Sequence, residues 1–123
     1  MAVTAKLHDR SEQLCEGAID LQHLARMTLG ERSLEREVLA LFDRQAELLL
    51  PRIRKSTQPV AAATAHTLKG SALGIGAFAV ARAAEAVERA SDKDLHNAVE
   101  TLRTALVAAS TEIGRRLREA DRD

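Results

Sequence analysis

The sequence contains almost no aromatic residues: Trp and Tyr are absent, and the two phenylalanines are Phe42 and Phe78. The chain therefore lacks the aromatic platform on which nucleic-acid bases stack. Its 18 basic residues are matched by 18 acidic ones, so no excess positive charge is available to neutralise the phosphates of a duplex. These two absences predict that the protein has no nucleic-acid partner.

Cysteine and long apolar segments are also scarce. Cys15 is the single cysteine, which excludes an intramolecular disulfide and favours a reducing cytosol. The longest apolar runs, such as residues 48–50, are far shorter than the roughly 20 residues of a membrane span. Residues 1–10 are too polar for a signal peptide. We therefore expect a cytoplasmic protein without a membrane partner.

Helical periodicity dominates the 123 residues, and no segment shows the alternation of a strand. The length is typical of one domain, which we expect to span residues 1–123 with a core at about 31–117. The 46% of hydrophobic residues are largely Ala and other aliphatic types, which suits closely packed helices. The expected helices cover about residues 4–16, 21–29, 34–53, 59–75, 77–90 and 95–117.

Several residues mark the ends of these helices. Asp20 is suited to cap the short second helix, and Gly30 to end it. Pro51 interrupts the next apolar stripe and is expected to kink or end that helix, whereas Pro59 suits a first helical turn. Gly74 and Gly76 favour a tight connection, and the charged residues 118–123 are expected to fray. The apolar stripe consists of Leu34, Val38, Leu41, Phe42, Gln45, Leu49 and Ile53.

Long amphipathic helices joined by short connections favour antiparallel neighbours. The expected fold is therefore all-α, an antiparallel up-down bundle of four helices with a short additional helical segment at the N-terminus.

The helix at residues 59–75 carries a histidine in unusual surroundings. At about 100° per residue, Leu68 and Ile75 lie roughly opposite His66, and this side is suited to burial. The imidazole should therefore project into solvent among small side chains and one exposed leucine. The residues that share its side are Ala62, Ala63, Lys69, Gly70 and Leu73.

Most histidines of this kind are idle surface or packing residues, and that interpretation stays open here. It leaves Gly70 unexplained, because a glycine inside a helix costs about 1 kcal/mol relative to alanine. Gly70 would leave free volume beside the imidazole for an approaching partner. Lys69 is an ordinary surface lysine when taken alone, but beside a phosphorylated imidazole its ammonium would offset the phosphoryl charge.

A longer motif around this histidine resembles the histidine-containing phosphotransfer (HPt) domains of two-component phosphorelays. It comprises His66-Thr-Leu-Lys-Gly-Ser-Ala72, Ile75-Gly-Ala77, Val80-Ala81, Ala84 and Val87-Glu88, with Phe42-Asp-Arg-Gln45 as a weaker extension. The resemblance implies a four-helix bundle in which His66 accepts a phosphoryl group at Nε2 from an aspartyl phosphate. Lys69 would assist electrostatically, and Gly70 would permit close approach.

The same resemblance implies the partners. These would be response-regulator receiver domains, a hybrid histidine kinase, or both, and the protein would be a monomeric phosphocarrier rather than an enzyme. No glycine-rich nucleotide loop is present, so we expect no ATP-binding or kinase domain of its own. We expect no bound cofactor; Mg²⁺ would be held by the receiver domain.

Two further residues match positions near the active histidine of related domains. Glu88 matches a glutamate or glutamine that hydrogen-bonds the histidine, which would fix its tautomer. A surface ion pair of Glu88 with Arg82 or Arg89 is the alternative. Gln45 matches a glutamine that lies near the histidine, and a purely structural amide in the apolar stripe is the alternative.

The segment Leu73-Gly74-Ile75 departs from the family pattern, in which a small residue and often Asn occur. Leu73 and Phe78 would enlarge an apolar docking patch that also includes Ala62 and Ala63. The other histidines, His8, His23 and His96, lack comparable surroundings.

Two other functions remain open: a bundle that docks receivers without carrying phosphate, and the dimerisation and phosphoacceptor segment of a histidine kinase. In such kinase segments Glu follows the histidine, whereas Thr67 follows His66 here. A metal site is not expected, because no His, Cys or acidic pair near His66 has ligand spacing.

Overall fold

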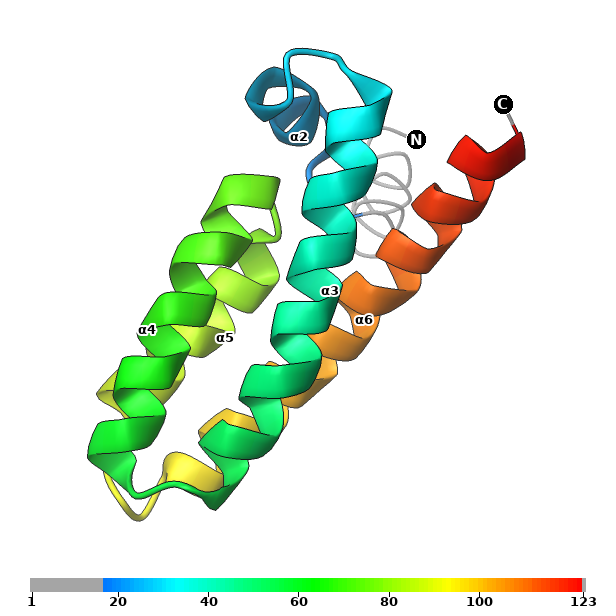
Figure 1. The fold of residues 1–123 in the computed structure, drawn as a ribbon. Helices are drawn as coiled ribbons and strands as arrows, with labels where there is room; N and C mark the ends of the chain where they lie inside the picture. The colour runs from blue at the N-terminus through cyan, green and yellow to red at the C-terminus, as the bar shows by residue number, and fades with distance from the viewer. Residues whose placement is uncertain (1–16, 123) are drawn as a thin grey trace, which may run out of the picture.

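The computed structural model describes residues 17–122, with side chains up to residue 119. Within this range the chain forms helices and no strand (Figure 1). The helices are α2 (Leu21–Met27), α3 (Arg32–Lys55), α4 (Gln58–Ile75), α5 (Phe78–Arg89) and α6 (Leu95–Arg122). The helix expected at residues 4–16 lies outside the described residues.

Helices α3 to α6 alternate in direction and form a four-helix bundle, which confirms the predicted all-α fold (Figure 1). Each of them packs mainly on two neighbours: α3 on α4 and α6, and α5 on α4 and α6. The short helix α2 lies across one end of the bundle and contacts α4 (Figure 1). Both long helices, α3 and α6, extend beyond the shorter pair α4 and α5 at this end (Figure 1).

The ends of the helices follow from local residue chemistry. The Asp20 carboxylate accepts a hydrogen bond from the His23 backbone N–H at 3.1 Å and so caps α2 as expected. Pro59 lies in the first turn of α4, where its missing N–H is not needed. Gly76 ends α4 with a φ of +82°, a left-handed conformation that glycine adopts without a steric penalty. The connection between α4 and α5 is therefore only two residues long, Gly76 and Ala77.

The core is aliphatic, and small residues dominate where α4 meets α5. Because alanine side chains are short, these two helices approach each other closely along a length of several turns. Larger side chains from α3 and α6 fill the remaining space. Buried residues of the four helices include Leu39, Phe42, Ile53, Ala61, Ala65, Leu68, Ala72, Val80, Ala84, Val87, Leu102, Leu106 and Ile113.

The buried face of α3 differs from the predicted stripe at Leu41, which is 57% exposed. The core-facing positions are Glu35, Leu39, Phe42, Ala46 and Ile53, which follow three-, four- and seven-residue spacing. Leu41 lies about 100° from Phe42 around the helix and falls on the solvent side.

Two helices continue further than expected. Pro51, expected to kink or end its helix, does not end α3; the helix continues to Lys55, and Ile53 beyond the proline is fully packed in the core. Helix α6 continues to Arg122 rather than stopping at residue 117. Arg116 and Leu117 hold its final turns, through an ion pair with Glu35 and through packing against the core.

None of the helices within residues 17–122 combines the length and the apolar character that a crossing of the bilayer requires.

Candidate functional site

His66 projects from the middle of α4 into solvent, with 69% of its side chain exposed. The opposite side of the helix is buried at Ala61, Ala65, Leu68 and Ala72. This burial agrees with the prediction from helical periodicity that the side of the helix opposite His66 is buried. The imidazole is thus accessible from outside while its helix is anchored in the core.

The surface beside the imidazole consists of small groups. Ala63 and Gly70 are exposed, and Ala62 is half-buried. A Cβ atom built at Gly70 would meet no atom within 4 Å. Packing within the chain therefore does not require glycine at this position, and the open space lies on the side from which a partner would approach.

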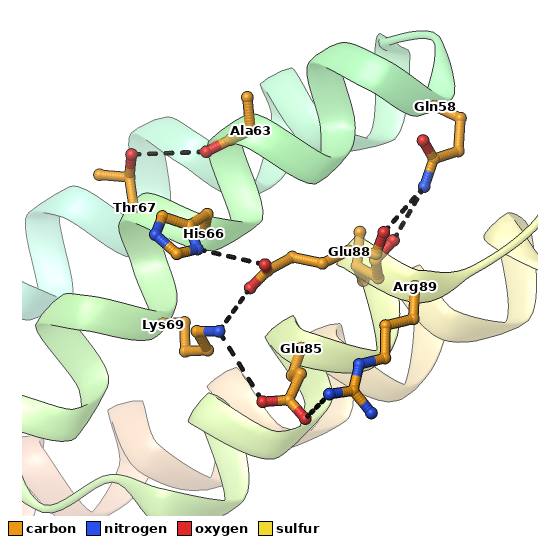
Figure 2. Close-up of polar contacts among 9 residues, drawn as sticks. Gln58, Ala63, His66, Thr67, Lys69, Glu85, Glu88 and Arg89 are labelled. Carbon is orange, nitrogen blue, oxygen red and sulfur yellow. Dashed lines mark hydrogen bonds and ion pairs between the residues drawn. The ribbon is translucent and has the colours of Figure 1, made fainter.

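The orientation of His66 is set by a carboxylate from the neighbouring helix. Glu88 on α5 places Oε2 at 3.1 Å from His66 Nδ1 (Figure 2). An ionised carboxylate only accepts hydrogen bonds, so Nδ1 carries the proton and donates it. In the neutral ring the lone pair then resides on Nε2, the nitrogen that faces away from Glu88.

Lys69 completes a charged network between α4 and α5. Its Nζ lies 3.0 Å from Glu88 Oε1 and 3.7 Å from Glu85 Oε2. Glu85 in turn forms an ion pair with Arg89 at 3.3 Å. Figure 2 shows Lys69 reaching from α4 between the two carboxylates of α5. The ammonium is thus one helical turn from the imidazole and linked to it through Glu88.

The pKa of Glu88 lies below its ordinary value. Partial burial raises this pKa, but the contacts with Lys69 and His66, and the positive charges of these two groups, lower it by more. Glu88 is therefore ionised at neutral pH and available as an acceptor for the Nδ1 proton.

The expected contact between Glu88 and His66 is present, and the alternative pairing of Glu88 with Arg82 or Arg89 is not among the ion pairs of the described residues.

Gln45 differs from Glu88 in its contacts. It is half-buried on α3, and in residues 17–122 the hydrogen bonds of His66 and Glu88 do not include it. The structure thus brings Glu88 to the histidine and leaves Gln45 without such a contact. The catalytic roles assigned to these residues stay predictions.

Two of the four residues of the expected docking patch, Leu73 and Phe78, line one groove between α4 and α5, whereas Ala62 and Ala63 do not. Leu73 is 44% exposed and Phe78 is half-buried, and the groove has a volume of about 320 Å³. Its other lining residues are Lys69, Ala81, Arg82 and Glu85. The groove therefore begins at Lys69, directly beside His66, and continues toward the α4–α5 connection.

Two residues of the site were not predicted. Glu85 lies three residues before Glu88, on the same face of α5, and this spacing could have indicated it. Gln58 Nε2 donates hydrogen bonds to the backbone oxygens of Val87 and Ala90 at 3.2 and 2.9 Å, which ties the start of α4 to the end of α5. It satisfies carbonyls that a helix end leaves without partners, and no sequence pattern points to this pairing.

Comparisons with known proteins agree with this geometry. The family model of the Hpt domain matches residues 34–112. A search of solved structures finds the histidine phosphotransferase ShpA from Caulobacter crescentus, which is 34% identical and has a TM-score of 0.69. The match covers 85% of this chain and 94% of that one. A search of curated protein sequences finds no match.

The matched family model covers more than half of the chain, including every residue of the His66 site. With the helical bundle, the exposed histidine and the structural neighbour in agreement, this protein belongs to the Hpt-domain family.

Proposed function

We propose that this chain is a phosphocarrier that relays a phosphoryl group through His66 between the aspartates of receiver domains, or from a hybrid histidine kinase to a receiver. One observation supports this most directly. His66 is exposed on a sterically bare face while Glu88 holds its Nδ1 side at 3.1 Å, so Nε2 is free toward solvent.

The proposed step is a displacement at phosphorus. The Nε2 lone pair attacks the aspartyl phosphate of a receiver, the N–P bond forms, and the P–O bond breaks with its electron pair left on the aspartate carboxylate. The ring gains positive charge as the bond forms, and the Glu88 carboxylate stabilises the charge through the Nδ1 proton. Lys69, one helical turn from His66, would assist by offsetting the charge of the phosphoryl oxygens, because such transfers depend mainly on positioning and electrostatics.

The same proposal assigns the remaining components to the partner. The receiver domain supplies the acidic pocket and its Mg²⁺, and this chain, as a monomer in the cytoplasm and one domain, carries the phosphate without ATP chemistry of its own. The groove next to Lys69, with Leu73 and Phe78, together with Ala62 and Ala63, is the surface on which the receiver would dock.

The direct test uses the His66→Gln variant and a receiver domain labelled with radioactive phosphate. The wild-type chain should take up label that is labile in acid and stable in base, whereas the variant should take up none and keep the same helical circular dichroism. His96→Gln, an exposed histidine at the start of α6, is the matched control and should be labelled normally. Undiminished labelling of His66→Gln would reject the assignment.

Two further results would select another function. A wild-type chain that binds receivers but never carries label would be a docking bundle. Sedimentation as a two-chain species would favour the histidine-kinase segment over a monomeric carrier.

A further inference from the structure

Lys69 is held by two carboxylates rather than left free for a phosphoryl group. Its Nζ contacts Glu88 Oε1 at 3.0 Å and Glu85 Oε2 at 3.7 Å, and only 21% of its side chain is exposed. An ammonium has three N–H donors. With two carboxylates of α5 within 4 Å of Nζ, part of the positive charge of Lys69 is offset before any phosphate arrives.

The two carboxylates differ in what else they contact. Glu88 also binds His66 Nδ1, so its contact with Lys69 keeps the ammonium near the imidazole. Glu85 lies one helical turn toward the start of α5, where it lines the groove and contacts Lys69. Figure 2 shows the Glu85 carboxylate on the side of Lys69 that faces away from His66. A phosphoryl group on Nε2 and the carboxylate of Glu85 therefore compete for the same ammonium.

Arg89 limits how strongly Glu85 competes for the Lys69 ammonium. Its side chain is 79% exposed and its guanidinium pairs with Glu85 Oε1 at 3.3 Å, which leaves Oε2 for Lys69. Removal of the guanidinium would leave Lys69 as the cation paired with Glu85 among the ion pairs of residues 17–119, and would strengthen that contact.

We infer that Glu85 is a positioning residue that withholds Lys69 from the phosphoryl group and thereby lowers the equilibrium share of phosphate carried by His66. The inference rests on the proposed phosphocarrier function. Its consequence is a phosphohistidine that gives up its phosphoryl group more readily, with the P–N bond broken and the new P–O bond formed on the aspartate of the next receiver. Glu85 thus biases the exchange toward the receiver.

The experiment measures the ratio of phosphohistidine to aspartyl phosphate at equilibrium with one receiver domain. Glu85→Gln should raise this ratio about two- to fivefold, the range expected for one partly exposed ion pair. Arg89→Gln should lower the ratio. If Glu85 had only a structural role, both variants would change the ratio of phosphohistidine to aspartyl phosphate in the same direction, because both remove the ion pair between Glu85 and Arg89. Glu100→Gln is the control: it removes the same charge from a glutamate of α6 that pairs with Arg103 at 3.0 Å, and the ratio should not change.

A double-mutant cycle with Lys69→Gln tests whether Glu85 acts through Lys69. In the Lys69→Gln background, Glu85→Gln should no longer raise the ratio. An equal increase in both backgrounds would show a general field effect and overturn the inference, as would an unchanged ratio in Glu85→Gln itself. Wild-type chain that is never labelled would instead reject the phosphocarrier function, so the two failures are distinguishable.

Discussion

The chemistry of the site depends on three neighbouring residues of α4 that differ in exposure, in charge and in side-chain size. His66 is exposed, but its ring is held through Nδ1. Lys69 is mostly covered and paired with carboxylates, and Gly70 has no side chain at all. The three residues follow one another on one side of α4, so a partner meets the imidazole, the cation and the open space together.

Gly70 allows a prediction that separates folding from function. Gly70→Ala should raise the free energy of unfolding by about 0.5–1 kcal/mol, because the Cβ meets no atom and alanine is the better helix former. The larger Gly70→Gln should slow transfer from a receiver at least about tenfold, since its side chain fills the space beside His66. Urea unfolding and single-turnover transfer rates measure the two effects.

The control for this prediction is Gly114→Ala on α6. Its Cβ would touch only the guanidinium of Arg118 at 3.4 Å, which is flexible enough to move. A similar gain in stability with an unchanged transfer rate is expected. A transfer rate that is also unchanged in Gly70→Gln would show that partners do not need this space.

The lowered pKa of Glu88 predicts how the site contributes to stability as the pH changes. The contacts with Lys69 and His66 favour the ionised carboxylate in the folded state. This stabilisation is complete above the pKa of an unfolded glutamate, about 4.3, and is lost as the pH falls through the lower folded pKa. The difference in unfolding free energy between wild type and Glu88→Gln should therefore persist above the pKa of an unfolded glutamate and shrink as the pH falls below it. A difference that stays constant across this range in urea unfolding would contradict the prediction.

At the scale of elements, the tight connection between α4 and α5 sets the register of the site. Gly76 adopts φ +82°, and its carbonyl accepts a hydrogen bond from the Asp20 backbone N–H at 2.9 Å. The same contact attaches the start of α2 to the end of the bundle. Since α4 carries His66 and α5 carries Glu88, the geometry of this turn decides which residues of the two helices face each other.

Gly76→Ala should lower the free energy of unfolding by roughly 2 kcal/mol or more. The new Cβ would lie 2.9 Å from the Asp20 carbonyl oxygen, and the left-handed conformation adds about 1–2 kcal/mol of backbone strain. Gly30→Ala is the matched control: Gly30 has φ +74°, but a Cβ added there would meet no atom within 4 Å, so this variant incurs the backbone strain alone. Chemical denaturation compares the two variants. Equal losses would show that the contact with Asp20 adds nothing.

At the scale of the whole molecule, an ion pair joins residues that are 81 positions apart. Arg116 on α6 donates two hydrogen bonds to the largely buried Glu35 carboxylate on α3, at 2.9 and 3.2 Å. This contact joins the start of α3 to the last turns of α6.

Glu35→Gln should lower the free energy of unfolding by about 1–3 kcal/mol, because it removes the negative charge closest to a partly buried guanidinium. The exposed Glu37 on the same helix is the control, and Glu37→Gln should change stability by less than about 0.5 kcal/mol. Thermal unfolding of both variants measures the effect. Phosphate uptake should persist in Glu35→Gln, since the pair lies on α3 and α6 rather than on the helices that build the site.

Much of the fold follows from local chemistry and could be predicted. The apolar period of 3.6 residues, the cap at Asp20 and the glycine at position 76 predict the helices and their order. The face of His66 follows from the same period, because Leu68 on the opposite side must be buried. The structure differs from the expectations where long-range packing decides: Leu41 is exposed and α3 continues past Pro51, since Ile53 packs into the core and holds the last turn in place.

The sequence alone determined an exposed histidine with a lysine and a glycine beside it, because one helix with one buried side leaves no other orientation for those three residues. Only the tertiary structure decided which side chains of α5 meet them. The alanine-rich contact of α4 with α5 and the two-residue turn at Gly76 and Ala77 set the relative rotation and height of the two helices. For that reason Glu88 reaches His66, and Glu85 reaches Lys69.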